Sequence, residues 1–212
     1  MFQEAMKVIR NTEGLYEGNL VYYFKIVYAD CRKRKNPYHN LYHTLWVVLQ
    51  VSNACKYYRD RLAPIEIFII LMAALFHDFK HPGIRTNDAL NIETAILAMD
   101  LVLLDEHVQY FEKIAWYIRT TEHPYVIEER FLDLCAQILR DADMSQVFSP
   151  EGVPYVVNGL SKEWKEDPRD LLEMQPTFIR NIKFLTGWAK ETFGPLVPKR
   201  IAEAENMLQQ FA

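Results

Sequence analysis

The sequence is poor in glycine, with 7 residues in 212, and hardly anywhere alternates apolar with polar residues. Both features argue against a sheet-based fold, because a strand with one buried face alternates with a period of two. Apolar residues instead recur at spacings of three and four, which is the helical period. We therefore predict an all-α fold, a compact helical bundle forming a single domain over residues 1–212.

Cysteine is also scarce, and Cys31, Cys55 and Cys135 are widely spaced with no Cys-x-x-Cys pair. An odd number at such spacings argues against a disulfide framework and is typical of reduced thiols in a cytoplasmic protein. The first residues lack the pattern of a secretory signal. The longest apolar run, residues 65–76, contains Glu66 and is too short to span a bilayer. We expect a cytoplasmic protein without a membrane partner.

Positive charge is not in excess, since the formal net charge is -4. Broad electrostatic binding to nucleic acid therefore has little support, and a small anionic substrate would need a local positive centre. The basic run RKRK at 32–35 is a possible anion-facing patch, but a solvated helix end is the favoured interpretation.

Proline and glycine interrupt the helical period and divide it into eight predicted helices. These cover residues 15–31, 40–60, 64–77, 88–105, 107–120, 127–140, 168–190 and 196–210. No interruption is long enough to be a domain linker. Metal centres in such bundles are commonly built from side chains that face inward.

Histidine is concentrated: five of the 6 residues lie in the clusters YHNLYH at 38–43, HDFKH at 77–81 and TTEH at 120–123. His39 and His43 are four residues apart, so both project from one face if they share the first helical turn. Such a pair can ligate one metal, or divide the roles of ligand and proton carrier. Two partly exposed, hydrogen-bonded histidines are the alternative.

His77 and Asp78 directly follow a wholly apolar helical segment, so two polar side chains reach the edge of the core. A buried carboxylate needs a partner, and a metal ion is a good one, although a helix-terminal ion pair would also serve. The segment RDADMSQ at 140–146 adds Asp141 and Asp143, which are both candidates by chemistry. Imidazole and carboxylate ligands from three helices suit Zn, Fe, Mn or Ni, and carboxylate with water suits Mg.

In these motifs the sequence resembles the HD superfamily of metal-dependent phosphohydrolases and, within it, the catalytic domain of class I cyclic nucleotide phosphodiesterases. Five motifs occur in the family's order: YHNxxH at 38–43, HDxxHPG at 77–83, NxExA at 91–95, ADMS at 142–145 and QxxFI at 175–179. The chain departs from the family pattern in having Gln146 where the family usually has asparagine, and in a short segment between Asp78 and Asp143.

The resemblance implies two divalent metal ions. His43, His77, Asp78 and Asp143 would hold a tight Zn, and Asp78 would bridge to a second ion, Mg or Mn, that is coordinated largely by water. The motif favours Asp143 over Asp141. Residues around the water of the second metal would be His81, Glu93 and Thr121.

The resemblance also implies the reaction, hydrolysis of a 3′,5′-cyclic nucleotide to the 5′-monophosphate by a hydroxide that bridges the metals. His39 would be the general acid that protonates the departing O3′. Tyr38, Gln175 and Phe178 would bind the substrate, the amide bonding the edge of the base and the ring stacking on its face. A glutamine amide does not choose between adenine and guanine. Without the family, Gln175 and Phe178 would be a surface amide beside a core aromatic.

Two alternatives remain open from the sequence. One is an HD-type phosphohydrolase acting on another nucleotide phosphoester, because a fold does not fix a substrate. The other is a metal-containing nucleotide-sensing module without catalysis, against which the presence of His39 and the expected metal ligands counts. In each case the partner is a small nucleotide, and the sequence does not indicate an oligomeric state.

Overall fold

The computed structural model describes residues 1–210, and in this range it is helical with no β-strand. The α-helices are α1 (Phe2–Ile9), α2 (Val21–Arg34), α3 (Leu41–Tyr57), α4 (Pro64–Phe76), α5 (Asp88–Asp100), α6 (Phe111–Arg119), α7 (Leu134–Asp143), α8 (Gly152–Trp164), α9 (Pro168–Asn181), α10 (Gly187–Phe193) and α11 (Val197–Gln209). Short 3-10 helices lie at Arg59–Arg61, Asp105–Tyr110, Glu129–Phe131, Met144–Phe148 and Gly194–Leu196. The predicted all-α class is confirmed.

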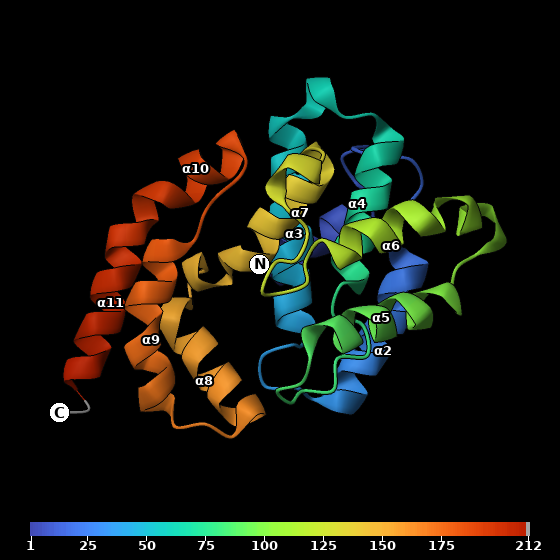
Figure 1. The fold of residues 1–212 in the computed structure, drawn as a ribbon. Coiled ribbons are helices and arrows are strands. Elements are labelled where there is room, and N and C mark those ends of the chain that lie inside the picture. Colours follow the sequence, from blue (N-terminus) through green and yellow to red (C-terminus); the bar gives the residue numbers. More distant parts are fainter. Residues whose placement is uncertain (211–212) are drawn as a thin grey trace.

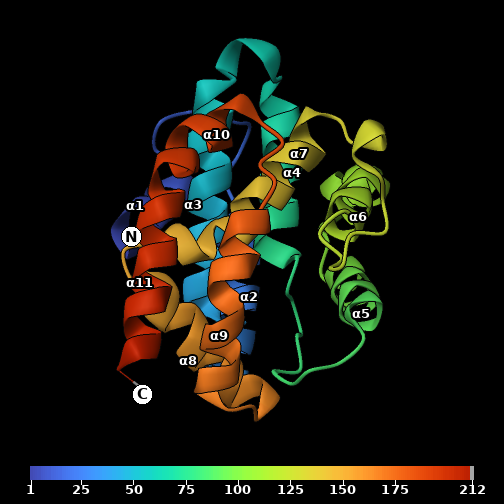
Figure 2. The ribbon, with the colours of Figure 1, turned by 60° about the vertical axis from the view of Figure 1, so that its left-hand side comes forward.

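Helix α4 is the centre of the core. Its ten residues from Ile67 to Phe76 are all buried, and it packs against α3, α6 and α7. A helix that is apolar on every side must be surrounded by other helices. Figures 1 and 2 show α3, α4 and α7 at the middle of the molecule, with α8 to α11 on one flank and α5 and α6 on the other.

This arrangement places three helix ends together. Helix α3 begins, and α4 and α7 end, in the region where the predicted metal ligands lie. Polar groups are tolerated there because helix ends leave backbone groups that need partners. The centre of the fold thus supplies rigid anchors for the site.

Two helices were missed by the sequence prediction, α1 and α8. Pro154 does not prevent α8, because it occupies the first turn, where the missing proline N–H costs no intrahelical hydrogen bond. The predicted helix 168–190 is in fact two helices, α9 and α10. Between them the carboxylate of Asp141 accepts hydrogen bonds from the backbone N–H groups of Leu185 and Thr186, which stabilises the break.

The described helices include none that is both long and apolar enough to cross a membrane.

Candidate metal centre and adjoining cavity

Each of the four predicted metal ligands lies at a helix end. His43 is in the first turn of α3, whose N-cap Asn40 accepts hydrogen bonds from the backbone N–H groups of Tyr42 at 2.8 Å and His43 at 3.4 Å. His77 is the C-cap of α4 and Asp78 follows it. Asp143 is the last residue of α7. The backbone therefore fixes all four positions before any ligand binds.

The four side chains bring four ligand atoms close together. His43 Nε2 lies 3.3 Å from Asp78 Oδ2 and 3.2 Å from Asp143 Oδ1. His77 Nε2 lies 3.1 and 3.5 Å from the same two oxygens, and the two Nε2 atoms are 3.2 Å apart. Neighbouring atoms that share one ion at about 2.0–2.2 Å lie about 2.8–3.6 Å from one another, depending on the angle between them. His43, His77 and Asp143 thus form a group that could hold one metal ion, and Asp78 Oδ2 lies within 3.3 Å of both imidazole Nε2 atoms.

The proton positions on the two imidazoles also favour a metal site. His77 Nδ1 lies 2.9 Å from the carbonyl oxygen of Ala74, which can only accept, so Nδ1 carries a proton. His43 Nδ1 lies 3.2 Å from Oε1 of the buried Gln146 and donates to it in the same way. In the neutral imidazoles, both Nε2 lone pairs therefore face the cluster. Holding the distal nitrogen in this way is how proteins orient metal-ligating histidines.

Asp78 gives an independent sign that a cation belongs here. Its Oδ2 atom is buried, and its only polar neighbours within residues 1–210 are the two imidazole Nε2 atoms at 3.1 and 3.3 Å. This is costly for a carboxylate unless those rings are protonated or a cation is bound. Burial opposes protonation of His43, but hydrogen bonds and charge from Asp143 and Asp78 outweigh it and raise its pKa to about 9. The pKa of His77 is raised against burial by the same carboxylates. A metal replaces such protons on binding, so these residues fit a divalent ion.

A second group, formed by His39, His81 and Glu163, lies beside the first. His39 precedes α3 and its N-cap, so it does not share the first helical turn with His43. Its Nδ1 lies 2.6 Å from Oε2 of Glu163, whose side chain is fully buried. The other carboxylate oxygen of Glu163 accepts hydrogen bonds from the backbone N–H groups of Tyr38 and His39 at 2.7 and 2.8 Å. Glu163 therefore fixes both the backbone and the ring of His39.

His81 stacks against the His39 ring with 3.8 Å between the ring centroids. Burial, and to a smaller extent the neighbouring His39, lower the pKa of His81 to about 4. His81 is therefore neutral near pH 7. Its ring also contacts the side chain of Asn91 on α5, at 3.2 Å.

Glu93 and Thr121, which were expected around the second metal, make other contacts. Glu93 lies on an exposed part of α5 and forms an ion pair with Arg119 at 2.7 Å, so the structure does not bring it to the cluster. Asn91, which precedes Glu93 by two residues on the same helix, is the α5 residue that contacts His81. Thr121 is buried just after α6, and its hydroxyl donates to the carbonyl of Ile118 at 2.8 Å.

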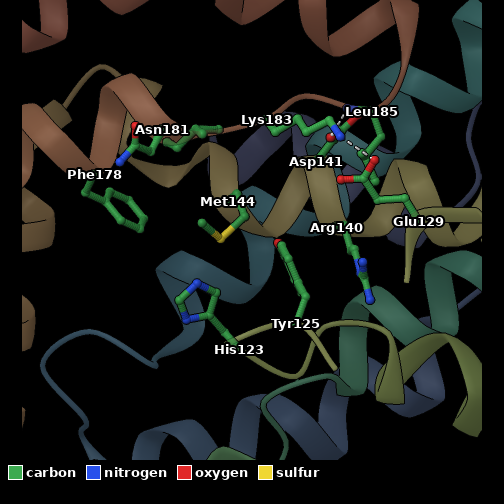
Figure 3. A pocket seen from close by; sticks show the side chains of 11 residues that line it. His123, Tyr125, Glu129, Arg140, Asp141, Met144, Phe178, Asn181, Lys183 and Leu185 are labelled. Carbon is green, nitrogen blue, oxygen red and sulfur yellow. Dashed lines mark hydrogen bonds and ion pairs between the residues drawn. The ribbon is translucent and has the colours of Figure 1, made fainter. Parts of the chain in front are cut away.

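Next to Asp143, a cavity of about 240 Å³ opens between the end of α9, the end of α7 and the segment 123–129. Figure 3 shows Phe178 and Met144 on one side of it and Tyr125 and Arg140 on the other. Of the predicted substrate residues, Phe178 lines this cavity. Gln175 is buried one turn earlier on α9, with its Oε1 atom unpartnered within residues 1–210. Tyr38 does not line this cavity and lies beside the metal cluster, with its ring centroid 5.1 Å from that of His43.

Asp141, the alternative to Asp143, is engaged elsewhere. Its carboxylate accepts from the backbone N–H of Leu185 and from both the backbone N–H and the hydroxyl of Thr186, at 2.7–2.9 Å. It therefore acts as an anchor for the segment between α9 and α10.

Sequence reasoning missed Glu163, because α8 itself was missed. A signal was present: Val153, Val156 and Leu160 recur at helical spacing, and Glu163 continues the same face. A carboxylate on an apolar helical face needs a specific partner. Here that partner is His39.

Comparison with known proteins identifies the family. The family model for 3′5′-cyclic nucleotide phosphodiesterases matches residues 38–148, just over half of the chain. This segment contains all four clustered ligands and His39. The chain belongs to the 3′,5′-cyclic nucleotide phosphodiesterase family, which is metal-dependent, and its histidine and aspartate groups can hold metal. The predicted resemblance is confirmed.

Curated relatives are similar over shorter segments. A dual specificity calcium/calmodulin-dependent 3′,5′-cyclic nucleotide phosphodiesterase 1 of Drosophila melanogaster is 39% identical over 82 residues, covering 36% of this chain and 10% of the relative. The 3′,5′-cyclic-AMP phosphodiesterase 4 of Dictyostelium discoideum is 36% identical over 62 residues, covering 29% and 6%. A human high affinity cAMP-specific and IBMX-insensitive 3′,5′-cyclic phosphodiesterase 8A is 35% identical over 100 residues, covering 43% and 11%. The chain thus matches only about a tenth of the length of these relatives.

Proposed function

We propose that this protein hydrolyses a 3′,5′-cyclic nucleotide to the 5′-monophosphate. The observation that carries the proposal is the pairing of two units: a four-residue cluster with metal-ligand spacing, and a histidine held by a buried carboxylate beside it. Family membership supports a cyclic nucleotide as the substrate class. The partner is thus a small nucleotide.

His43, His77, Asp78 and Asp143 would hold the tight ion, for which zinc is our proposal because zinc favours mixed imidazole and carboxylate ligands. Asp78 would also contact a second ion, Mg or Mn, which prefers oxygen ligands and water. When bound, such ions neutralise phosphodiester charge and lower the pKa of coordinated water. His81 and Thr121 remain candidates for the surrounding hydrogen bonds, whereas Glu93 is engaged by Arg119.

His39 would serve as the general acid. Glu163 accepts the proton of Nδ1, which leaves Nε2 as the nitrogen that can deliver a proton to the departing O3′. Glu163 also holds the backbone of Tyr38 and His39, so both the main chain and the ring of His39 are fixed by one buried carboxylate. Neutral His81, stacked on this ring, does not add a competing positive charge.

Substrate binding would involve Tyr38, Gln175 and Phe178. Phe178 offers an aromatic face to the cavity, and a base stacked on an aromatic ring gains about 1–3 kcal/mol. Gln175 has an unpartnered buried oxygen one turn away, which gives it hydrogen-bonding capacity for a ligand. We also propose that residues 1–212 form one domain.

The proposal is tested by incubating the purified chain with Mg or Mn and either cyclic AMP or cyclic GMP, and detecting products by chromatography. Release of the 5′-monophosphate is expected, and it should disappear in His39→Ala while metal content is retained. A chain that hydrolyses neither cyclic nucleotide, yet cleaves another nucleotide phosphoester, would replace this substrate with that one.

A further inference from the structure

The cavity beside Asp143 contains a buried cation that pairs with no carboxylate. Arg140 is 2% exposed, and it takes part in no ion pair within residues 1–210. Its Nε and Nη2 groups donate to the backbone carbonyls of Thr120 and Ile127. These two bonds use two of the five guanidinium N–H groups. No atom of Arg140 is both buried and unpartnered within residues 1–210, so the remaining N–H groups are open to the cavity that Arg140 lines and can donate to a ligand there.

The carboxylates of the same cavity do not serve as that acceptor. Glu129 pairs with Lys183 at 2.6 Å, and Asp141 accepts from the segment between α9 and α10. The ring of Tyr125 covers the guanidinium, with Cζ 4.1 Å from the ring centroid, which keeps its plane fixed (Figure 3). Arg140 therefore presents a rigid, planar set of donors to a site that has room for a ligand.

The lining favours a flat ring system with a polar edge over a simple anion. Phe178, Met144 and Tyr125 contribute aromatic and thioether surface, whereas Asp141 and Glu129 would repel a multiply charged anion. The volume of about 240 Å³ corresponds to roughly eight water molecules at about 30 Å³ each, so it admits a nucleobase.

We propose that this cavity holds the purine base of the substrate and that Arg140 makes it selective for guanine over adenine. Guanine presents two neighbouring acceptors, O6 and N7, which match the arginine fork. Adenine presents N7 beside the N6 amino donor, which would face the guanidinium with like polarity. Across the cavity, the amide of Asn181 has both a donor and an acceptor for the rest of the base. This inference rests on the proposed function and adds the base to it.

The first test compares product binding to the metal-loaded chain by calorimetry, using guanosine and adenosine 5′-monophosphates. The guanine compound should bind at least about tenfold more tightly, since one hydrogen bond to a charged group is worth about tenfold or more. The 7-deaza analogue of the guanine compound, which lacks N7, should lose most of this advantage. Equal affinities for the three nucleotides would overturn the inference.

The second test changes the protein. Arg140→Lys keeps the charge but loses the planar fork, and it should bring the two affinities to within about threefold of each other. The matched control is Arg130→Lys, which changes an exposed arginine of the preceding 3-10 helix Glu129–Phe131 that does not line the cavity, and it should keep the preference. A preference that survives Arg140→Lys would contradict the role of Arg140.

The two proposals fail separately. Guanine-selective binding without hydrolysis of any cyclic nucleotide would remove the proposed reaction and leave the base site. Hydrolysis of cyclic GMP and cyclic AMP with equal kcat/KM, together with equal product binding, would leave the reaction and remove the guanine preference.

Discussion

At the scale of single residues, His39 and Glu163 form a unit in which each carboxylate oxygen of Glu163 accepts different hydrogen bonds. One oxygen accepts a hydrogen bond from the ring N–H, and the other accepts hydrogen bonds from two backbone N–H groups. Replacement by glutamine preserves an oxygen for the backbone but removes the charge that faces the ring. The variant therefore separates orientation of the backbone from stabilisation of the proton on His39.

We predict that Glu163→Gln lowers kcat for cyclic nucleotides by about 10- to 100-fold with little change in KM, since general acid catalysis contributes about 10²–10⁴-fold. A phosphodiester with a p-nitrophenolate leaving group needs no proton donor, so its hydrolysis should hardly change. Steady-state kinetics on both substrates measure the contrast. Equal losses on the two substrates would show that Glu163 supports the fold rather than His39.

Asp141 and Asp143 provide a matched pair only two residues apart. Asp143→Asn should reduce metal affinity by at least about 100-fold, because even losing an outer hydrogen-bond partner of a metal ligand costs about 10–100-fold. Asp141→Asn should keep the metal and lower the free energy of unfolding by about 1–3 kcal/mol, since its contacts lie between α9 and α10. Elemental analysis and denaturant unfolding measure the two effects. Loss of metal in Asp141→Asn alone would reverse the assignment.

At the scale of helices, α3 depends on the cap at its beginning. Asn40 accepts from two backbone N–H groups there and also receives a hydrogen bond from the Tyr155 hydroxyl at 3.1 Å. The cap thus connects α3 to α8 directly beside His43.

Asn40→Ala should lower the free energy of unfolding by about 1 kcal/mol, which is typical for loss of an N-cap side chain. It should also weaken metal binding, because His43 sits in the turn that the cap holds. Asn40→Asp, which caps equally well, is the control and should restore stability. Thermal unfolding and metal titration report both; a stable variant with unchanged metal affinity would show that the cap does not position His43.

The helices also show how much of the site could be predicted from the sequence. The apolar segment of α4 and the polar residues that follow it were sufficient to predict His77 and Asp78 at the edge of the core, and the structure places them there. Glu163 was not predicted, because its importance arises from a contact with His39 at a separation of 124 residues. Asn91 was given no role of its own, because its contact with His81 joins α5 to the loop after α4 and does not follow from helical spacing. Period and spacing identify helix faces, but they do not say which faces meet.

At the scale of the whole molecule, the metal ligands connect α3, α4 and α7, which form its centre (Figure 1). An ion that binds only the folded chain stabilises it by mass action, by about 2.7 kcal/mol at one hundred times its Kd. Removing metal with a chelator should therefore lower Tm, and adding zinc back should restore it. The ligand variant Asp143→Asn is the control, because the chelator should have little further effect on its Tm. A Tm that is independent of chelator in the unaltered chain would count against a metal at this position.

We also predict that residues 1–212 unfold as one unit. Helices from the whole described range contribute to a continuous core around α4, so a part of the chain cannot open without exposing it. Scanning calorimetry of the metal-free chain should give one transition with equal calorimetric and van't Hoff enthalpies. Two resolved transitions would show that the chain contains two domains.

The hydrogen bond from His77 to the Ala74 carbonyl has a consequence for how the site can change over time. The acceptor is main chain, so any residue type at position 74 presents it, provided that α4 keeps its last turn. The tautomer of His77 is therefore protected from point mutation in a way that the tautomer of His43, which depends on the Gln146 side chain, is not. The tautomer of His77 is therefore retained wherever α4 keeps its last turn, whereas a substitution of Gln146 can change the tautomer of His43.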